Sequence, residues 1–273
     1  MLSHDLQWYY PEKISDALKL IKKEGVILHA GGTRILKTQP RNLKGFVDIS
    51  GLGLNYIQKK GKNVLIGSAA TLSEVIKYCK DTGSLAGLSC ALSEAASTPL
   101  RNRITIGGSV KDFPVWSSLY APLIALNAKL EMAGDITSCT VEDYVKKNII
   151  KTKHIIKHVI IPDDKEVICK VRRFVLIRFE YPIFNIAIAY KVKNKIIEDS
   201  AIVITGTAGR YHRFKASEKA LDGKPLSEES IAKCLEHFSP KFHSDYKYSE
   251  EYREKVAKVY LVDLLNEAKE EMK

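Results

Sequence analysis

The stretch Ala30-Gly31-Gly32-Thr33-Arg34-Ile35 decides how this chain is interpreted, together with Thr105-Ile106-Gly107-Gly108-Ser109. We call the first stretch the first glycine loop and the second stretch the second glycine loop. In each, a glycine pair follows a short apolar run, and paired glycines let a main chain turn tightly and approach a ligand closely. The N–H groups of such a turn form a concave anion site that suits a diphosphate. Two such loops could hold one diphosphate-bridged cofactor between them.

Either loop alone is weak evidence for a cofactor site, because a glycine pair after a strand usually marks an ordinary turn. Neither loop has the G-x-G-x-x-G spacing of a dinucleotide fingerprint, and neither has the Gly-Lys-Ser/Thr ending of a P-loop. The interpretation therefore depends on the pair of loops and on what surrounds them.

The composition narrows the classes of protein to consider. The chain has 273 residues, 45% of them hydrophobic and 27% charged, which is typical of one large or two moderate globular domains. The net charge of +11 would suit nucleic acid, an anionic cofactor or an acidic partner subunit. Lysine and arginine are spread along the chain without a dense tract, so we expect no nucleic-acid binding. We expect no signal peptide and no membrane span, and therefore a cytoplasmic protein.

The cysteines and histidines give no sign of a metal site. The five cysteines never occur at C-x-x-C spacing, which argues for reduced, mostly buried thiols and against an iron–sulfur cluster or structural zinc in this chain. His154 and His158 stand four residues apart in a probable strand-forming run, where residues at that spacing lie too far apart for one metal. We expect solvated histidines there and no metal ligand.

Apolar periodicity and turn residues predict alternating helices and strands in the first part of the chain. Helices are expected over 12–24, 85–97, 215–221, 227–237 and 248–270, with one that opens at Thr71 and is stopped by Gly83 and a short one beginning at Val141. Strands are expected over 26–28, 46–49, 64–66, 129–132, 155–161, 167–179, 184–192 and 200–205. The polar segment Pro162-Asp163-Asp164-Lys165 is the best domain boundary. Strands followed by helices beyond it predict an α+β C-terminal domain.

With both loops placed, the order of features resembles the FAD-binding medium subunit of molybdenum hydroxylases, the family of carbon monoxide dehydrogenase and xanthine dehydrogenase. The resemblance covers nearly the whole chain. It is carried by the Ala30–Thr33 loop, Val47-Asp48-Ile49, Ile66-Gly67-Ser68-Ala69-Ala70-Thr71, Arg101-Asn102 before Thr105-Ile106-Gly107-Gly108, and the run from Pro122 to Ala128 leading to Glu131. It implies an α+β protein with a two-part FAD-binding domain over 1–163, a small α/β subdomain (1–55) and a larger antiparallel subdomain (56–163). A C-terminal α+β domain would then cover 164–273.

The resemblance also implies where FAD is held. Its diphosphate would lie on both glycine loops, and Ser118 stands nearest to an aspartate that holds the adenosine end in the family. The expected cofactor-binding residues are Ala30, Gly31, Gly32, Thr33, Arg34, Ile35, Thr105, Gly107, Gly108, Ser109 and Ser118. Loop N–H groups, short hydroxyls and the charge of Arg34 suit a diphosphate. No catalytic side chain is expected, because such a subunit binds, orients and tunes its cofactor.

In function, the resemblance implies an oxidoreductase subunit of a heteromeric complex. A molybdopterin large subunit would oxidise the organic substrate, and [2Fe–2S] clusters in a small subunit would pass electrons to FAD and on to NAD or another acceptor. The sequence departs from the family pattern at four places: Arg34, Ser109, the missing acid at Ser118, and a missing lysine near Leu176 and Arg178. These departures motivate an alternative, a flavin-free scaffold subunit of the same kind of complex.

Several roles stay open at this point. Arg34 could contact phosphate or stand exposed beside the loop, whereas Arg101 and Asn102 are expected to shape the second loop rather than touch the cofactor. Trp116 and Tyr120 could stack on the flavin ring, face a partner or pack in the core. Asn185 could line the flavin edge, but a plain edge strand is the preferred interpretation.

Overall fold

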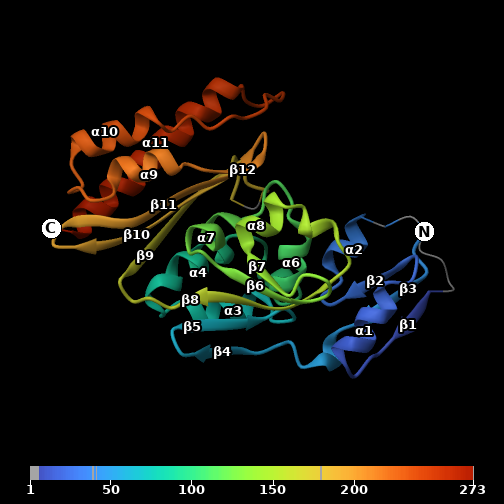
Figure 1. Ribbon diagram of the computed structural model, residues 1–273. Helices are drawn as coiled ribbons and strands as arrows, with labels where there is room; N and C mark the ends of the chain where they lie inside the picture. Colours follow the sequence, from blue (N-terminus) through green and yellow to red (C-terminus); the bar gives the residue numbers. More distant parts are fainter. Residues whose placement is uncertain (1–5, 39, 41, 179, 273) are drawn as a thin grey trace. The chain divides into compact units, whose positions relative to one another are not determined.

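The computed structural model describes residues 6–272 except 39, 41 and 179, and of Leu36 only the main chain. The chain divides into two compact units (Figure 1). Unit 1 comprises 1–78, 96–113 and 127–162, and unit 2 comprises 79–95, 114–126 and 163–273. The two segments 79–95 and 114–126 therefore pack with the C-terminal part of the chain, although they interrupt unit 1 in sequence.

Unit 1 begins with a small parallel sheet. Strands β1 (Gln7–Tyr9), β3 (Gly45–Asp48) and β2 (Val26–His29) lie in that order, and both neighbouring pairs are parallel. Helix α1 (Ile14–Ile21) buries Ala17 and Ile21 against this sheet, in a core that includes Val26 and Val47. Because parallel strands end at the same edge, β2 and β3 present their carboxyl ends side by side. Helix α2 (Thr33–Thr38) follows β2 at that edge.

The rest of unit 1 is an antiparallel sheet with short helices. Its strand order is β4 (Ile57–Lys60), β5 (Asn63–Gly67), β8 (Ile155–Pro162), β6 (Lys129–Ala133) and β7 (Ser138–Thr140). The helices are α3 (Leu72–Cys79), α5 (Thr98–Arg101), α6 (Ile106–Asp112) and α8 (Val141–Lys146), with single 3₁₀ turns η1 (Ser50–Leu52) and η3 (Ile149–Lys151). At the start of α3, Thr71 Oγ1 accepts the N–H of Glu74 and the Glu74 carboxylate accepts the N–H of Thr71 at 2.7 Å. This reciprocal pair is a capping box.

Unit 2 is built on the antiparallel sheet β12 (Arg210–Arg213), β11 (Ile196–Thr207), β10 (Phe184–Lys193) and β9 (Val167–Phe174), in that order. Helices α9 (Lys215–Leu221), α10 (Glu228–Glu236) and α11 (Glu250–Glu271) cover one face, where Phe184, Ile186 and Ile188 are buried (Figure 1). Alternate residues of a strand point to opposite faces. Asn185 and Ala187 therefore face α4 (Ala86–Ser93), which follows η2 (Gly83–Leu85), and α7 (Tyr120–Ala125).

The predicted α+β class and its arrangement, a small α/β part, an antiparallel part and a C-terminal α+β part, are confirmed. The expected long helices and most strands are present, but several short elements were missed, among them α2, α6 and α7. The helix expected over 85–97 is shorter, because the chain leaves it after Ser93 and Thr98-Pro99 begins α5 rather than ending a helix. Proline is tolerated in a first helical turn, where its missing N–H leaves no bond unmade.

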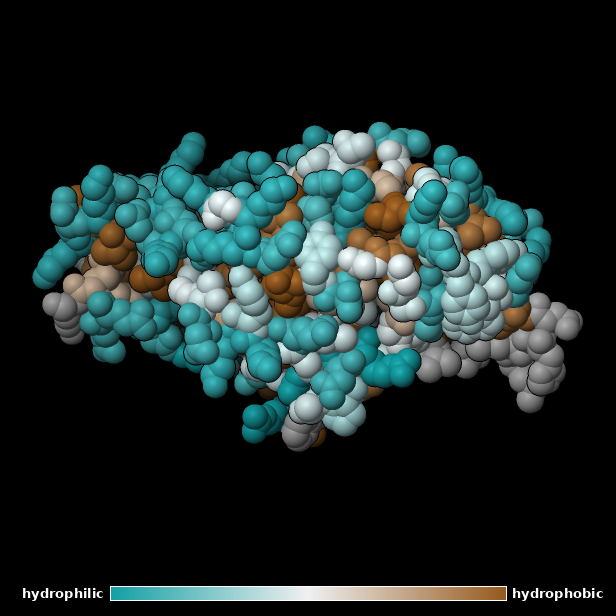
Figure 2. All heavy atoms as spheres, turned by 90° about the horizontal axis from the view of Figure 1, so that it is seen from below, coloured by the Kyte–Doolittle hydropathy of each residue, from teal (hydrophilic) through white to brown (hydrophobic). Residues whose placement is uncertain are grey.

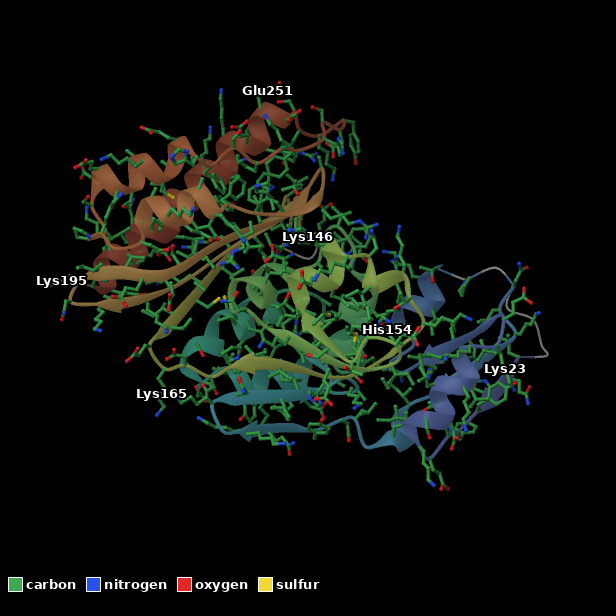
Figure 3. All side chains as sticks on the ribbon, viewed as in Figure 1. Lys23, Lys146, His154, Lys165, Lys195 and Glu251 are labelled. Atoms are coloured by element: carbon green, nitrogen blue, oxygen red, sulfur yellow. The ribbon has the colours of Figure 1, made fainter. Side chains whose placement is uncertain are left out.

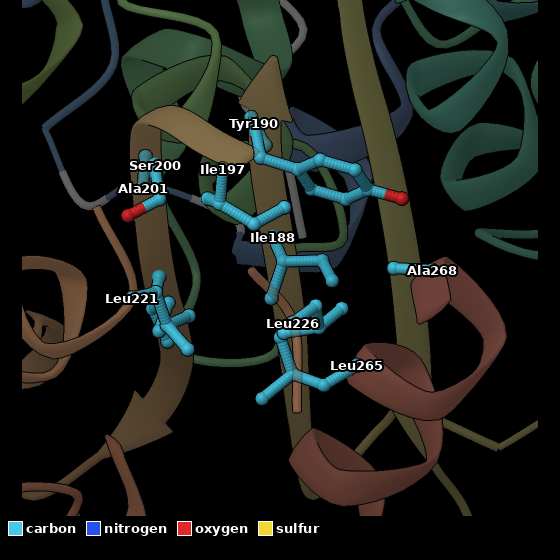
Figure 4. Close-up of a pocket in the computed structure, with 11 residues that line it drawn as sticks. Ile188, Tyr190, Ile197, Ser200, Ala201, Leu221, Leu226, Leu265 and Ala268 are labelled. Atoms are coloured by element: carbon cyan, nitrogen blue, oxygen red, sulfur yellow. The ribbon is translucent and has the colours of Figure 1, made fainter. Parts of the chain in front are cut away.

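The surface and the cavities of the described residues add two observations. The face drawn in Figure 2 is largely hydrophilic, with apolar residues in small separate groups. No helix among residues 6–272, outside the three gaps, is long and apolar enough to cross a membrane. A cavity in unit 2, lined by Ile188, Tyr190, Leu265, Ala268 and their neighbours, has room for about one water molecule (Figure 4). It is too small to hold a cofactor.

Candidate cofactor site

The first glycine loop joins the end of β2 to the start of α2. Gly32 has φ +72°, the left-handed region that favours glycine, and Thr33 is already the first helical residue. The first N–H groups of a helix have no partner within it. Among the described residues, nothing accepts the main-chain N–H groups of Gly31, Gly32 and Thr33. The loop therefore offers adjacent open donors at a helix N-terminus, which suits an anion.

The second glycine loop is the first turn of α6, and its main-chain donors are used within the protein. The N–H of Gly107 donates to Ser68 O at 2.9 Å, and the N–H of Ser109 donates to Thr105 O at 3.0 Å. Thr105 caps the helix, since its Oγ1 accepts the N–H of Gly108 at 3.2 Å. Of these donors, only that of Gly108 is held by a side chain that can rotate away.

The glycines of the two loops are required for different reasons. A Cβ on Gly31 would lie 1.6 Å from Arg103 O, and a Cβ on Gly107 would lie 2.5 Å from the Cβ of Ser68. Both positions are filled by the protein itself. A Cβ on Gly108 would meet only Thr105 Oγ1, at 2.9 Å, and Gly108 is exposed. Packing of the chain thus explains Gly31 and Gly107, while Gly108 leaves open space beside the main chain.

Unit 1 brings the two loops together through two arginines. Arg103, just before the second loop, directs Nε and Nη2 at Gly31 O over 3.4 and 3.3 Å. Arg34 in α2 donates its Nε to Asp112 Oδ1 in α6 at 2.8 Å, with side chains 41% and 25% exposed. Ala30, Thr33 and Ile35 stand in the same loop-to-helix segment. Arg34 is therefore an ion-pair partner of α6, and only its Nε is bonded among the described residues.

Ser118 belongs to unit 2, apart from the ten other predicted residues, which all lie in unit 1. Its buried hydroxyl donates to Asn185 Oδ1 at 3.2 Å, and Asn185 Nδ2 donates to Ser117 O and Thr205 Oγ1. This network fixes the segment before α7 on the sheet. The preferred interpretation of Asn185 as part of an edge strand is wrong, because β10 lies between β9 and β11 and Asn185 is fully buried.

The structure also limits the possible roles of Arg101, Asn102, Trp116 and Tyr120. Arg101 binds the carbonyl of Ala96 and donates to Thr98 Oγ1 at 2.9 Å, and Asn102 Oδ1 accepts from Ser73 Oγ at 2.6 Å. Both side chains thus hold the segment that precedes the second loop, and their expected role in shaping the loop stays a prediction. Tyr120 is fully buried and packs in the core of unit 2. The ring centres of Trp116 and Tyr181 lie 4.6 Å apart.

Two residues beside the first loop were missed. His29, the last residue of β2, stands opposite Asp48, the last residue of β3, and His29 Nδ1 lies 3.2 Å from Asp48 Oδ2. The available signal was two polar residues that each end a buried strand, since parallel strands bring such residues to one edge of a sheet. Both strands were expected from the sequence, but the alignment of their ends depends on their pairing in the sheet.

The prediction of solvated histidines at 154 and 158 is wrong, because both side chains are buried. Thr152 Oγ1 donates its proton to Ile149 O, so in its contact with His154 this oxygen accepts the proton on Nδ1. Nε2 of His154 therefore carries no proton and accepts the hydroxyl proton of Tyr144 at 2.8 Å. His158 Nδ1 lies 2.7 Å from the hydroxyl of Tyr56. The described part of the chain holds no group of three or more potential metal-ligating side chains.

The buried His154, labelled in Figure 3, predicts a loss of stability in mild acid. Burial, with a smaller effect from the charge of Lys111, lowers the pKa of His154 from 6.5 to about 4. Between these values the unfolded chain binds the proton more readily, so stability is complete above about pH 6.5 and falls toward pH 4. We expect urea midpoints to fall over this range, and less steeply in His154→Gln. Equal slopes in both proteins would show that His154 does not contribute.

Comparison with known proteins assigns the class of this protein. The family described as "FAD binding domain in molybdopterin dehydrogenase" matches residues 4–164, and the "CO dehydrogenase flavoprotein C-terminal domain" matches residues 178–268. The first match spans more than half of the chain. The protein carries an FAD-binding domain followed by the C-terminal domain of such flavoproteins.

The relatives are medium chains of related enzymes. The glyceraldehyde dehydrogenase medium chain of Sulfolobus acidocaldarius is 24% identical over 98% of this chain and 99% of its own length. The nicotine 6-hydroxylase medium subunit of Paenarthrobacter nicotinovorans is 25% identical over 91% and 92%. In structure, quinoline 2-oxidoreductase from Pseudomonas putida 86 matches with TM-score 0.87 at 17% identity, covering 100% of this chain and 99% of that chain. Carbon monoxide dehydrogenase from Oligotropha carboxidovorans matches with TM-score 0.85 at 22% identity, covering 96% of each. The chain belongs to the family of FAD-binding medium subunits of molybdenum hydroxylases.

Proposed function

We propose that this chain carries FAD on its two glycine loops and passes electrons from iron–sulfur clusters of a small partner subunit to NAD or another acceptor. The observation that supports this is the arrangement of the loops within unit 1. Arg103 and the Arg34–Asp112 pair hold them side by side, and the first loop presents open N–H donors. The cytoplasm remains the expected location.

The residues present fit a diphosphate. The N–H groups of Gly31, Gly32 and Thr33 are the donors for its oxygens, and the hydroxyl of Thr33 adds a further one. The second loop contributes differently, because most of its donors are used: Gly108 offers open space for close approach, and Ser109 offers its hydroxyl. Ala30 and Ile35 form the flanks of the first loop. Ser118 is the weakest member of the predicted set, since its hydroxyl proton is already donated to Asn185.

When bound, FAD supplies redox chemistry that can take up electrons singly and deliver them in pairs. The protein's own residues bind and orient it. The open N–H groups would stabilise the negative charge of the diphosphate through hydrogen bonds. The Arg34–Asp112 ion pair links α2 to α6. No side chain of this chain is assigned to acid–base work.

The partners follow from the same proposal. The relatives are named as medium chains or subunits. We infer a complex with an iron–sulfur small subunit and a molybdopterin large subunit, in which the large subunit oxidises the organic substrate. The alternative is a flavin-free scaffold subunit of such a complex, motivated by Arg34, Ser109, Ser118 and the missing lysine.

The visible absorption spectrum of the purified full chain separates these two functions. Flavin absorbance that stays with the protein through gel filtration, at about one flavin per chain after release and quantification, supports the electron carrier. A colourless chain that also fails to take up added FAD supports the scaffold. Purification with its partners then identifies the complex in either case.

The two ends of the Arg34–Asp112 ion pair make different predictions. Either Arg34→Gln or Asp112→Asn removes the link between α2 and α6, but only Arg34→Gln removes a positive charge beside the first loop. We expect Arg34→Gln to weaken FAD binding about tenfold, since one charge-assisted bond is lost. Asp112→Asn should weaken it by less than about threefold. Titrating flavin fluorescence measures both. Equal losses would mean that Arg34 acts only by holding the two helices together.

A further inference from the structure

His29 places a ring nitrogen against the first glycine loop. A Cβ on Gly32 would lie 2.9 Å from His29 Nε2, with the other ring atoms farther away, so this nitrogen is the part of the ring nearest the loop. The side chain is 19% exposed and therefore reachable from outside. It ends β2 directly before the residues whose main-chain N–H groups are open.

The opposite nitrogen of the ring is held by Asp48. Asp48 Oδ2 lies 3.2 Å from Nδ1, and the Asp48 carboxylate also accepts the N–H and the hydroxyl of Ser50. Burial raises the pKa of Asp48, but these hydrogen bonds outweigh it and the pKa lies below its usual value. The carboxylate is thus ionised, which fixes the proton of His29 on Nδ1 and leaves Nε2 directed at the loop.

Aromatic neighbours set the plane of the ring. The ring centre of Trp8 lies 4.8 Å from that of His29, edge to face, and that of Phe46 lies 5.8 Å away. Trp8 comes from β1, and Phe46 and Asp48 come from β3. Asp48 is the titratable group that faces the ring from these strands, while Arg103 and Arg34 are the charged groups bound at the loop and in α2. The imidazole is therefore oriented before any ligand arrives.

We propose that His29 is a contact of the FAD diphosphate, donating Nε2–H to a phosphate oxygen while Nδ1–H donates to Asp48. This inference rests on the proposed function. A neutral ring would direct a lone pair at the phosphate, whereas a ring protonated on both nitrogens donates to an anion on each side. Opposite charges nearby favour the charged form.

The test compares FAD and ADP, which share the diphosphate, on the full chain. We expect His29→Leu to bind both about tenfold more weakly, the loss of one charge-assisted hydrogen bond. Asp48→Asn should also weaken the binding of both ligands, because the anion that favours the doubly protonated ring is gone. His243→Leu, at an exposed histidine of unit 2, is the matched control.

Each result decides between the two levels of the proposal. If the wild type binds FAD and ADP and His29→Leu binds both equally tightly, the role of His29 is wrong and the proposed function stands. If the wild type binds no FAD at any pH, the proposed function fails and this inference fails with it. Thermal unfolding checks the fold of each variant. Should His29→Leu unfold, His29→Gln replaces it, with its affinity for FAD and for ADP as the readout.

Discussion

Replacing Gly108 with valine is expected to give a folded protein that does not retain FAD. A Cβ at this position would meet only the side chain of Thr105, and the main-chain φ of Gly108 is one that other residues adopt. The branched side chain would fill the open space where we place the diphosphate. We expect the affinity for FAD to fall at least about a hundredfold, because the cofactor must move away from the loop. Flavin content after gel filtration and a fluorescence titration measure the loss.

The control for Gly108→Val is Gly51→Val. Gly51 is also an exposed glycine of unit 1 without a positive φ, and the nearest atom to its Cβ would be Pro11 O at 3.9 Å. Gly51→Val should keep its flavin. Stoichiometric FAD in a well-folded Gly108→Val protein would place the diphosphate elsewhere.

Gly31→Ala is expected to have the largest effect on stability. The added Cβ would lie 1.6 Å from the carbonyl oxygen of Arg103 and overlap it. Arg103 cannot easily shift, because its N–H and the N–H of Ile104 both donate to Leu100 O. Neither segment can move without losing bonds. We expect the free energy of unfolding to fall by about 3 kcal/mol, the upper part of the usual range for overpacking. Urea unfolding followed by circular dichroism measures the change.

The matched comparison for Gly31→Ala is Gly108→Ala in the same unit. Alanine in a helix is favoured over glycine by up to about 1 kcal/mol, and the close approach to Thr105 Oγ1 takes back part of this gain. Gly108→Ala should therefore unfold at a similar or slightly higher urea concentration than the wild type. A destabilisation of Gly31→Ala no larger than that of Gly108→Ala would contradict the packing described for the first loop.

Much of the fold could be predicted from local pattern. The helix over 215–221 and strand β10 have clear periodicity and clear ends, so their positions were found closely. Strand β9 was expected to be longer than it is, β11 was expected to be shorter, and β12 was missed. The short helices α2 and α6 were not found. Helix α2 begins directly after Gly31-Gly32, and α6 contains Gly107 and Gly108 in its first turn, where glycine lowers helix propensity. Both helices are held by contacts distant in sequence, such as the Arg34–Asp112 pair.

The residues of the candidate site could be predicted where they belong to a sequence motif, but not where contacts between distant parts of the chain bring them together. The two loops stood out because paired glycines are uncommon. The reasons for these glycines could not be foreseen, since a Cβ on Gly31 would overlap Arg103 and a Cβ on Gly107 would overlap Ser68. The buried state of His154 was missed for the same reason, because His154 precedes β8 and its partners Tyr144 and Thr152 come from a helix and a turn earlier in the chain.

The interruption of unit 1 by segments of unit 2 has a consequence for dissecting the protein. The chain passes between the units at 78/79, 95/96, 113/114, 126/127 and 162/163, so no single peptide bond separates them. A fragment that begins at residue 164 would lack α4 and α7 and would leave the face of β9–β11 around Asn185 and Ala187 bare. The two family domains are thus consecutive in sequence but interleaved in the fold, so we expect a fragment that begins at residue 164 to be unstable.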